Sequence, residues 1–492
     1  PNYYEWVTCQ FATAIAGFVQ VNINPSYQTE ELRFALEKVG VKAVLTPKSF
    51  KKTNYCRILQ EIIRNQSTAK EGVGHVHDRS LPDLQHVILF GEEEKHRGMW
   101  SYSDLISGVG SMSENRLKEL EGRVKVDDPV NIQYTSGTTG YPKAATLSHH
   151  SLLNNSHLQG VRSQYGQGDH IICIPNPLYH CFGCAMGVIN ALSHKQTTVF
   201  PDAGFSPRRT LEVAGAERCT SIYGTPTMFI DMLIHLDDVK REGVDLTSVN
   251  AGYIAGAPCP VALCDRMVNE LGMRNISVLY GSTELSPVVS MSLLSQPPFE
   301  RIKNVGYVMD HTELQVVNED GQVVERGVKG ELLARGYSVM RGYYNDEERT
   351  RKEITPDKWY HTGDTACMAA DGAISIVGRT KDMIVRGGEN IYPTEIEQFL
   401  FKMNGVADAQ VIGVPDERFG EEVCAWIRLR EGATGLTSES IQEACKGKIA
   451  HYKIPRYILI KNESDFPLTA TGKVKKFELR EISKRELGLQ QV

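Results

Sequence analysis

The segment with the most evident chemistry combines glycines, hydroxyls and a lysine directly after a predicted strand at 130–134. It consists of Thr135, Ser136, Gly137, Thr138, Thr139, Gly140, Tyr141, Pro142 and Lys143. Its glycines let backbone N–H groups turn toward an anion, its hydroxyls add donors, and Lys143 supplies positive charge. The segment therefore predicts a phosphate-binding loop, with a plain polar surface loop as the alternative. It is not a Walker loop, because Tyr141 and Pro142 follow Gly140.

A carboxylate, Glu284, lies just beyond a second predicted strand at 276–280. A hard cation such as Mg²⁺ binds carboxylate oxygen and shares the phosphate oxygens of a nucleotide, so Glu284 is a candidate metal ligand. The alternative is an ordinary acidic residue at a helix N-terminus.

Two further charged residues fit a nucleotide. Asp364 follows a turn at 362–363 that would direct its carboxylate outward, where the two vicinal hydroxyls of a ribose are natural partners. Arg379 offers a planar pair of donors for ribose or phosphate. Each alone would be interpreted as a surface charge, and only their occurrence together with the loop favours nucleotide binding.

In chain order, these residues resemble the signatures of the adenylate-forming superfamily, which comprises acyl-CoA synthetases, luciferases and the adenylation domains of peptide synthetases. Besides the loop, six motifs match, at 256–258, 280–284, 360–364, 378–382, 387–390 and 467–473. The resemblance spans essentially residues 1–489. It is strongest to the mitochondrial medium-chain acyl-CoA synthetases, notably at 175–181 and 383–393.

The resemblance implies a reaction in two steps. A carboxylate resists nucleophilic attack, so it first attacks the α-phosphorus of ATP and forms an acyl-adenylate, and a thiol then displaces AMP. The first step requires charge neutralisation and in-line positioning rather than an enzyme nucleophile. By the same resemblance Lys473 bridges the α-phosphate and the carboxylate, Thr283 donates to the α-phosphate, and Lys143 and Glu284 complete the catalytic set.

The remaining ATP contacts also follow from the resemblance. Tyr280 and the segment 256–258 would form the adenine slot. Together with the phosphate loop, the expected ATP-binding residues are Gly256, Ala257, Pro258, Tyr280, Gly281, Ser282, Thr283, Asp364, Arg379 and Lys473.

The resemblance also implies motion of a C-terminal domain between the two steps. Lys381 matches the hinge position, and in the second pose Gly388 would line the tunnel for the pantetheine arm of coenzyme A, where a side chain could obstruct the thiol. A fixed linker between the domains is the alternative.

The acyl pocket is expected around an apolar segment at 180–187. Small residues there would leave room for an alkyl chain, and larger ones would line it. The expected pocket residues are His180, Phe182, Gly183, Met186, Tyr223 and Gly224. An ordinary buried core segment with a structural histidine is the alternative.

Composition limits the classes of function. Lys plus Arg is 54 and Asp plus Glu is 60 in 492 residues, a net charge of −6, which argues against nucleic-acid binding. Hydrophobic residues make up 41%, enough for a large core. The most apolar stretch, 181–192, is too short to span a bilayer, so at most a peripheral membrane contact is expected. Eleven scattered cysteines indicate free thiols.

The elements that must position these residues alternate between helix and strand up to about residue 280, which predicts a layered α/β fold. Short strands with turn signals from about 300 to 380 predict a small β-barrel-like subdomain. A new α+β pattern then begins. We therefore expect an AMP-binding domain at 1–381 and a mobile C-terminal domain at 382–492. The charged stretch 93–125 is expected to be a surface connection.

The leading hypothesis is a ligase that joins a medium-chain fatty acid to coenzyme A with ATP and Mg²⁺. An adenylation enzyme that serves a carrier protein or another acceptor, and an inactive nucleotide-binding scaffold, are the alternatives. Family resemblance implies a mitochondrial matrix location, with cytoplasm as the alternative. No targeting peptide is visible before Pro1, and the family pattern leads us to expect an N-terminally truncated chain.

Overall fold

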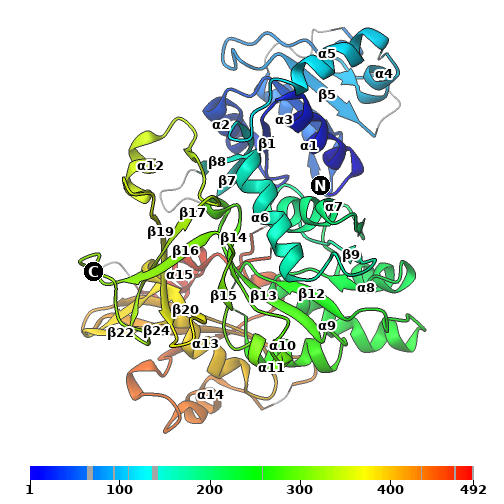
Figure 1. The fold of residues 1–492 in the computed structure, drawn as a ribbon. Helices are drawn as coiled ribbons and strands as arrows, with labels where there is room; N and C mark the ends of the chain where they lie inside the picture. Colours follow the sequence, from blue (N-terminus) through cyan, green and yellow to red (C-terminus); the bar gives the residue numbers. More distant parts are fainter. Residues whose placement is uncertain are drawn as a thin grey trace.

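The computed structural model describes residues 1–63, 70–91, 95–108, 110–135, 142–257, 259–433, 435–469 and 472–489. Figure 1 shows a large α/β part, blue to green, followed by an antiparallel sheet and a smaller C-terminal domain in yellow to red. This arrangement confirms the fold class predicted from the sequence.

A seven-stranded sheet forms the centre of the large domain. Its strands run in the order β10-β9-β11-β12-β13-β14-β15, and the first five are parallel. Their bounds are β9 (Ile171–Cys173), β10 (Thr197–Val199), β11 (Ser221–Ile222), β12 (Ala251–Ile254), β13 (Asn275–Gly281), β14 (Val288–Met291) and β15 (Tyr307–Val308).

Both faces of this sheet are buried. Cys173, Ile222 and Ile254 belong to one buried cluster, whereas the adjacent residues Tyr223 and Tyr253 belong to another on the opposite face. Successive side chains of a strand point to opposite faces, so a sheet covered on both sides needs nearly continuous apolar strands. This requirement explains why the apolar runs at 170–174, 197–200, 220–223, 251–255 and 276–280 predict the five parallel strands, whereas β14 and β15 are not predicted.

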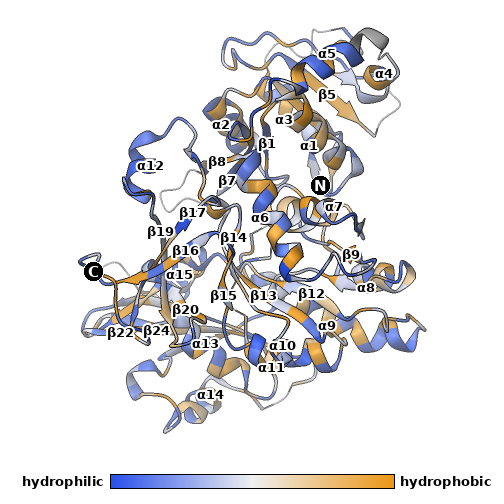
Figure 2. Cartoon of the chain, viewed as in Figure 1, coloured by the Kyte–Doolittle hydropathy of each residue, from blue (hydrophilic) through white to orange (hydrophobic). Residues whose placement is uncertain are grey.

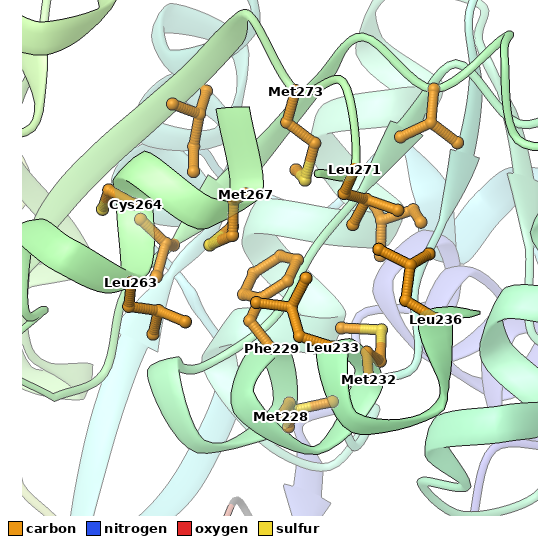
Figure 3. Close-up of a cluster of buried hydrophobic side chains, with 14 of the residues drawn as sticks. Met228, Phe229, Met232, Leu233, Leu236, Leu263, Cys264, Met267, Leu271 and Met273 are labelled. Atoms are coloured by element: carbon orange, nitrogen blue, oxygen red, sulfur yellow. The ribbon is translucent and has the colours of Figure 1, made fainter. Parts of the chain in front are cut away.

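Helix α9 begins at the edge of the sheet and is anchored in the core. Pro226 is its first residue, and the Thr225 hydroxyl caps it by accepting from the backbone N–H of Met228 at 3.4 Å. Figure 3 shows its apolar side chains, among them Phe229 and Leu233, facing Leu263 and Met267 of α10. Figure 2 shows α9 alternating between hydrophobic and hydrophilic residues, so one face remains free for polar contacts.

A four-stranded sheet carries the predicted phosphate loop. Its strands are β1 (Gln20–Asn22), β7 (Pro129–Thr135), β8 (Lys143–Ser148) and β18 (Gly342–Tyr343). Strands β7 and β8 are antiparallel, and Thr135 is paired with Lys143. The two ends of the loop are therefore fixed side by side.

A second four-stranded sheet, entirely antiparallel, follows in the chain. It consists of β16 (Thr312–Val317), β17 (Lys329–Gly336), β19 (Tyr360–Met368) and β20 (Ile374–Arg379). This is the β-rich subdomain expected from the sequence. The sequence at 322–324 predicts a further short strand, but it forms only a single bridge between Val323 and Val317.

Smaller strands and the helices complete the large domain. The strands are β2 (Ala43–Pro47), β3 (Ser49–Phe50), β4 (Thr53–Asn54), β5 (His86–Phe90) and β6 (Trp100–Ser101). The helices are α1 (Tyr4–Ala16), α2 (Thr29–Val39), α3 (Tyr55–Ile62), α4 (Tyr102–Ser107), α5 (Ser111–Glu121), α6 (His149–Arg162), η2 (Phe182–Ile189, a π-helix), α7 (Asn190–Ser193), α8 (Pro207–Ala216), α9 (Pro226–Arg241), α10 (Val261–Asn269), η3 (Thr283–Leu285), α11 (Pro298–Arg301) and α12 (Glu347–Glu353).

The C-terminal domain has its own sheet and two buried clusters. Its strands are β21 (Ile384–Arg386), β22 (Glu389–Ile391), β23 (Val406–Asp416), β24 (Gly420–Leu429) and β25 (Tyr457–Ile460). Its helices are η4 (Thr380–Asp382, at the junction), α13 (Pro393–Phe401), α14 (Ser438–Cys445), η5 (His451–Lys453), η6 (Glu463–Asp465) and α15 (Lys476–Glu486). The boundary at residue 381 stays a prediction.

Three sequence expectations need correction. The apolar sequence at 5–19 predicts a helix, but α1 ends at Ala16, because Gly17 adopts a left-handed conformation that caps it. The stretch 93–125, expected to be a surface connection, contains β6, α4 and α5. The sequence at 438–450 predicts another helix, but α14 ends at Cys445. Among the described residues, none of the helices is long and apolar enough to cross a membrane.

Candidate active site

The first part of the site is a cluster of charges around Glu284, which is only 5% exposed. Its Oε1 accepts hydrogen bonds from the Thr135 hydroxyl at 3.3 Å and the Tyr343 hydroxyl at 3.0 Å, and lies 3.3 Å from Lys143 Nζ. Burial alone would raise the pKa of Glu284, but the charge of Lys143 and these hydrogen bonds hold it below its ordinary value. Glu284 is therefore a carboxylate at neutral pH.

Pairing between strands builds this cluster. The pairing of Thr135 with Lys143 presents both side chains beside Glu284, which follows β13 in the short helix η3. Strand β18 pairs with β8 and brings in Tyr343 opposite Ala145. The predicted residues Thr135, Lys143 and Glu284 thus meet although they come from separate parts of the chain.

Two members of the cluster were missed by sequence reasoning. The hydroxyl of Tyr343 accepts from Lys143 Nζ at 2.6 Å and hydrogen-bonds to Glu353 of α12, which itself lies 3.3 Å from Lys143. Lys143 therefore contacts two carboxylates and a phenol. No sequence signal identified Tyr343 or Glu353, because each looks like an ordinary strand or helix residue more than 100 positions from the loop.

The second part of the site joins three residues that were predicted to bind adenosine. The Tyr280 hydroxyl donates to Asp364 Oδ2 at 2.6 Å, and Arg379 Nε lies 3.3 Å from Asp364 Oδ1. Asp364 and Arg379 are direct partners across β19 and β20. The antiparallel sheet therefore fixes the spacing between the carboxylate and the guanidinium.

Lys473 reaches this second part from the C-terminal domain. It follows Gly472 in a tight turn, where its backbone N–H donates to the Thr469 hydroxyl at 3.0 Å. Burial and the charge of the nearby Arg379 lower the pKa of Lys473 to about 8, against the opposing effect of Asp364. Lys473 thus lies near enough to Arg379 and Asp364 for their charges to act on it, an arrangement that we call the closed pose.

His180 is buried within electrostatic reach of both parts of the site. Burial and the charge of Lys473 lower its pKa to about 4, against the opposite effect of Glu284. Its Nδ1 accepts from the backbone N–H of Phe182 at 3.2 Å, which leaves the proton of the neutral ring on Nε2. His180 is therefore a neutral hydrogen-bond donor at physiological pH.

Thr283 and Cys181 are neighbours in the site. Both are buried, and Thr283 Oγ1 lies 3.5 Å from Cys181 Sγ. Burial raises the pKa of Cys181 to about 12, so the thiol is not ionised at neutral pH. This agrees with chemistry that needs no cysteine nucleophile.

The residues expected to line the acyl pocket are packed tightly. Phe182, Met186 and Tyr223 belong to one buried cluster, and the Tyr223 hydroxyl is 2.6 Å from that of Tyr165. A Cβ at Gly183 would lie 2.3 Å from the carbonyl oxygen of Pro177, and one at Gly224 would lie 2.9 Å from the ring of Phe229. Close packing therefore explains these glycines, and the pocket assignment stays a prediction.

Several predicted site residues have no contact that tests their role. Lys381 and Gly388 are exposed, in η4 and in the turn between β21 and β22. Gly281 meets the carbonyl oxygen of Pro287 so closely that no side chain would fit there, and Ser282 and Ala257 lie at their expected places near β13 and β12. The roles of these residues, and of Gly256, stay predictions. Seven predicted residues lie outside the described part of the chain: Ser136, Gly137, Thr138, Thr139, Gly140, Tyr141 and Pro258.

A metal ion at this site would need oxygen atoms from a substrate. Within the described ranges, no three His, Cys, Asp or Glu side chains are grouped so that they could hold one. Glu284 supplies a single carboxylate and Thr135 a hydroxyl. This donor set fits Mg²⁺, which is usually bound by one or two carboxylates together with substrate phosphates.

Comparison with known families decides the classification. Residues 1–344 match the family model described as AMP-binding enzyme, and residues 395–473 match the AMP-binding enzyme C-terminal domain. The chain belongs to the AMP-binding enzyme family. This membership confirms the resemblance that the motifs indicated.

Family relatives are similar over almost the whole chain. The medium-chain acyl-CoA ligase ACSF2, mitochondrial, of Danio rerio is 46% identical over 99% of this chain and 79% of its own length, and that of Homo sapiens is 41% identical over the same shares. The putative acyl-CoA synthetase YngI of Bacillus subtilis (strain 168) is 40% identical over 98% of this chain and 86% of its own.

Solved structures of family members share the fold. The anthranilate CoA ligase AuaEII in complex with anthranoyl-AMP has a TM-score of 0.82 and 25% identity, over 99% of this chain and 87% of that one. ATP-bound MatB from Rhodopseudomonas palustris has a TM-score of 0.77 and 24% identity, over 98% of this chain and 87% of that one.

Proposed function

We propose that the protein is an ATP-dependent medium-chain fatty acid–CoA ligase that works through an acyl-adenylate. The observation that carries the proposal is the closed pose, in which the turn at Gly472 lies against Thr225 of the large domain and Lys473 lies within electrostatic reach of Arg379 and Asp364. Relatives named medium-chain acyl-CoA ligases, 41–46% identical over 99% of the chain, support the substrate class.

In the first half-reaction a carboxylate oxygen of the fatty acid attacks the α-phosphorus of ATP, and pyrophosphate leaves. Both reactants are anionic, so the chain must supply positive charge where they meet. Lys473, with a pKa of about 8, is mainly protonated at pH 7 and can lie between the acid and the α-phosphate. Lys143 can neutralise the departing pyrophosphate, and the Nε2–H of His180 can donate to the attacking carboxylate.

Ribose recognition falls to the β-rich subdomain in this proposal. Asp364 can accept from the two ribose hydroxyls, while Arg379 and Tyr280 hold its carboxylate in place. Glu284 would hold Mg²⁺, whose role when bound is to screen the phosphate charges. Lys143, which contacts Glu284 directly, would then turn toward phosphate.

In the second half-reaction the thiol of coenzyme A attacks the carbonyl carbon of the acyl-adenylate. The new C–S bond forms, AMP leaves with the electrons of the C–O bond, and the thiol proton is lost. We propose that the thiol approaches in a second pose. The C-terminal domain would reach this pose by rotation about Lys381, and Gly388 would then line the tunnel through which the thiol enters. The exposure of both residues in the closed pose is compatible with such a change.

Two assays on the full-length protein test this function. Exchange of labelled pyrophosphate into ATP should depend on added fatty acid, and AMP release should depend on coenzyme A. Straight-chain acids of graded length should give the highest kcat/KM at medium length. Absence of acid-dependent exchange would reject the adenylation chemistry, and exchange without CoA-dependent release would indicate another acceptor.

We further propose a mitochondrial location, because relatives that are 41–46% identical over 99% of this chain are named as mitochondrial. Imaging of the full-length protein fused at its C-terminus to a fluorescent protein should show overlap with a matrix marker. A diffuse cytoplasmic signal would contradict this proposal.

A further inference from the structure

A buried ion pair joins the C-terminal domain to helix α9 of the large domain. Both terminal nitrogens of Arg428, on β24, donate to Asp231 Oδ1 at 3.2 Å. The side chains of Arg428 and Asp231 are only 8% and 14% exposed. Arg428 Nη1 also lies 2.9 Å from Glu463, but that carboxylate is 61% exposed. At this contact between the domains, Arg428 and Asp231 are thus shielded from solvent, whereas Glu463 remains exposed at the edge.

The same face of α9 supports the turn that carries Lys473. A Cβ at Gly472 would lie 3.5 Å from the Thr225 hydroxyl and 3.9 Å from Thr227 and Met228. Thr227 and Asp231 are four residues apart and lie on one face of the helix. The first turns of α9 thus meet the C-terminal domain twice, at Gly472 and at Arg428.

The opposite face of α9 is held in place by close packing in the core. Phe229, Met232 and Leu233 are buried in the cluster drawn in Figure 3, which also includes Phe401 of α13 from the C-terminal domain. A helix fixed on one face by a close-packed core is a rigid support for contacts on its other face.

We propose that Asp231 and Arg428 are positioning residues for adenylation: their pairing fixes the orientation of the C-terminal domain on α9 and so places Lys473 at the reacting atoms. The inference rests on the proposed function, because it assumes that Lys473 acts only in the closed pose. Rotation of the C-terminal domain would remove Lys473 and separate this pair in the same movement.

Removal of one charge from this buried pair should have a larger effect than removal of both charges. Burial raises the pKa of Asp231 to about 6 in spite of Arg428, so closing the domain desolvates a carboxylate at a cost. Removal of the guanidinium leaves that carboxylate buried without a partner, which is far more unfavourable than removal of both charges. The pair thus contributes correct orientation more than net stability.

The test measures the two half-reactions separately in full-length protein with octanoate. Arg428→Gln should slow acid-dependent pyrophosphate exchange by about tenfold or more, as expected when a buried pair loses one partner. It should leave octanoyl-CoA formation from supplied octanoyl-adenylate at the wild-type rate. The double variant Asp231→Asn/Arg428→Gln should recover most of the lost exchange, because it also removes the buried Asp231 carboxylate that Arg428→Gln leaves without its guanidinium partner.

Arg456→Gln is the matched control. Arg456 pairs with Asp416 at 2.9 Å within the C-terminal domain, and none of its hydrogen bonds or ion pairs with the described residues involves α9. This variant should leave both half-reactions unchanged. Equal slowing of both half-reactions by Arg428→Gln, or a double variant no faster than Arg428→Gln, would overturn the proposal.

Hydrogen–deuterium exchange on the free protein separates failure of this inference from failure of the proposed function. Arg428→Gln should speed amide exchange in peptides covering 227–236 and 472–479, whereas Arg456→Gln should not. If the wild-type protein shows no pyrophosphate exchange with any acid, the proposed function fails and this measurement still decides on the ion pair. Unchanged protection in Arg428→Gln would overturn the positioning role.

Discussion

At the scale of single residues, the site is governed by how far burial and neighbouring charge shift each ionisable group. Lys473 and His180 are both cations when protonated, and burial lowers the pKa of both, yet their protonation states at pH 7 differ. Lys473, with a pKa of about 8, stays mainly charged, and His180, with a pKa of about 4, stays neutral. One can neutralise an anion and the other can only donate a hydrogen bond.

The lowered pKa of Lys473 predicts the pH dependence of adenylation. A lysine that must be charged loses activity as pH rises through its pKa, and kcat/KM reports the free enzyme. We expect kcat/KM for pyrophosphate exchange to fall above about pH 8. Lys473→Arg should lack this fall, because a guanidinium stays charged, whereas a fall at the same pH in that variant would assign it to another group.

Removal of the Lys473 charge should separate the two half-reactions. Lys473→Ala is expected to lower pyrophosphate exchange by about 100-fold or more, the loss typical of removing one group that stabilises charge in a transition state. Thioester formation from supplied acyl-adenylate should persist. Comparable loss in both assays would reject the assignment of Lys473 to adenylation alone.

Glu284 is the residue whose removal should change the metal requirement. Glu284→Gln keeps the shape of the side chain and removes the charge that attracts Mg²⁺. We expect the Mg²⁺ concentration for half-maximal pyrophosphate exchange to rise by about tenfold or more, the loss caused by about 1.4 kcal/mol of lost binding free energy. Titration of Mg²⁺ at fixed ATP measures it, and an unchanged midpoint would contradict the ligand role.

At the scale of elements, backbone pairing determines which predicted residues meet. The type and position of the central strands could be predicted because they are buried on both faces, and so could the residues that follow them, such as Glu284. The order of the strands in the sheet could not be predicted, because an apolar run does not indicate which strands lie beside it. Tyr343 and Glu353 were missed for this reason: only the pairing of β18 with β8 reveals that they reach Lys143.

The π-helix η2 offers a prediction about stability. Gly183→Ala would place a Cβ 2.3 Å from the Pro177 carbonyl oxygen, and backbone there cannot move cheaply. We expect a loss of about 1 to 3 kcal/mol in the free energy of unfolding, the usual cost of overpacking. Gly166→Ala, with no atom near the new Cβ, is the control and should change little. Urea denaturation of both variants measures the difference, and equal midpoints would show that the contact can relax.

At the scale of the whole molecule, the site exists only while two domains are in contact. The motifs predicted that Lys473 would serve a site built from the large domain, and the closed pose brings these residues together. The ion pair between Asp231 and Arg428 could not be predicted, because each looks like a solvated charge in its own element and neither belongs to a motif. Contacts between domains depend on relative orientation, which local sequence patterns do not encode.

Because one bound ligand would contact both domains, we expect it to raise the melting temperatures of both. An unreactive analogue of octanoyl-adenylate should stabilise the closed pose by about 2.7 kcal/mol at 100 times its dissociation constant. Calorimetry should show both domains melting later and closer together. In Lys473→Ala the C-terminal domain should gain less than the large domain, and equal gains would show that Lys473 does not bind the analogue.

Lys143 is paired with two carboxylates, since Glu353 and Glu284 both lie 3.3 Å from its ammonium nitrogen. When a triphosphate enters the site, Lys143 therefore exchanges a carboxylate partner for a phosphate partner. The same exchange runs in reverse when pyrophosphate departs, because Glu353 is there to receive the lysine. Turnover can thus begin and end with the ammonium group paired to a carboxylate, which favours release of pyrophosphate.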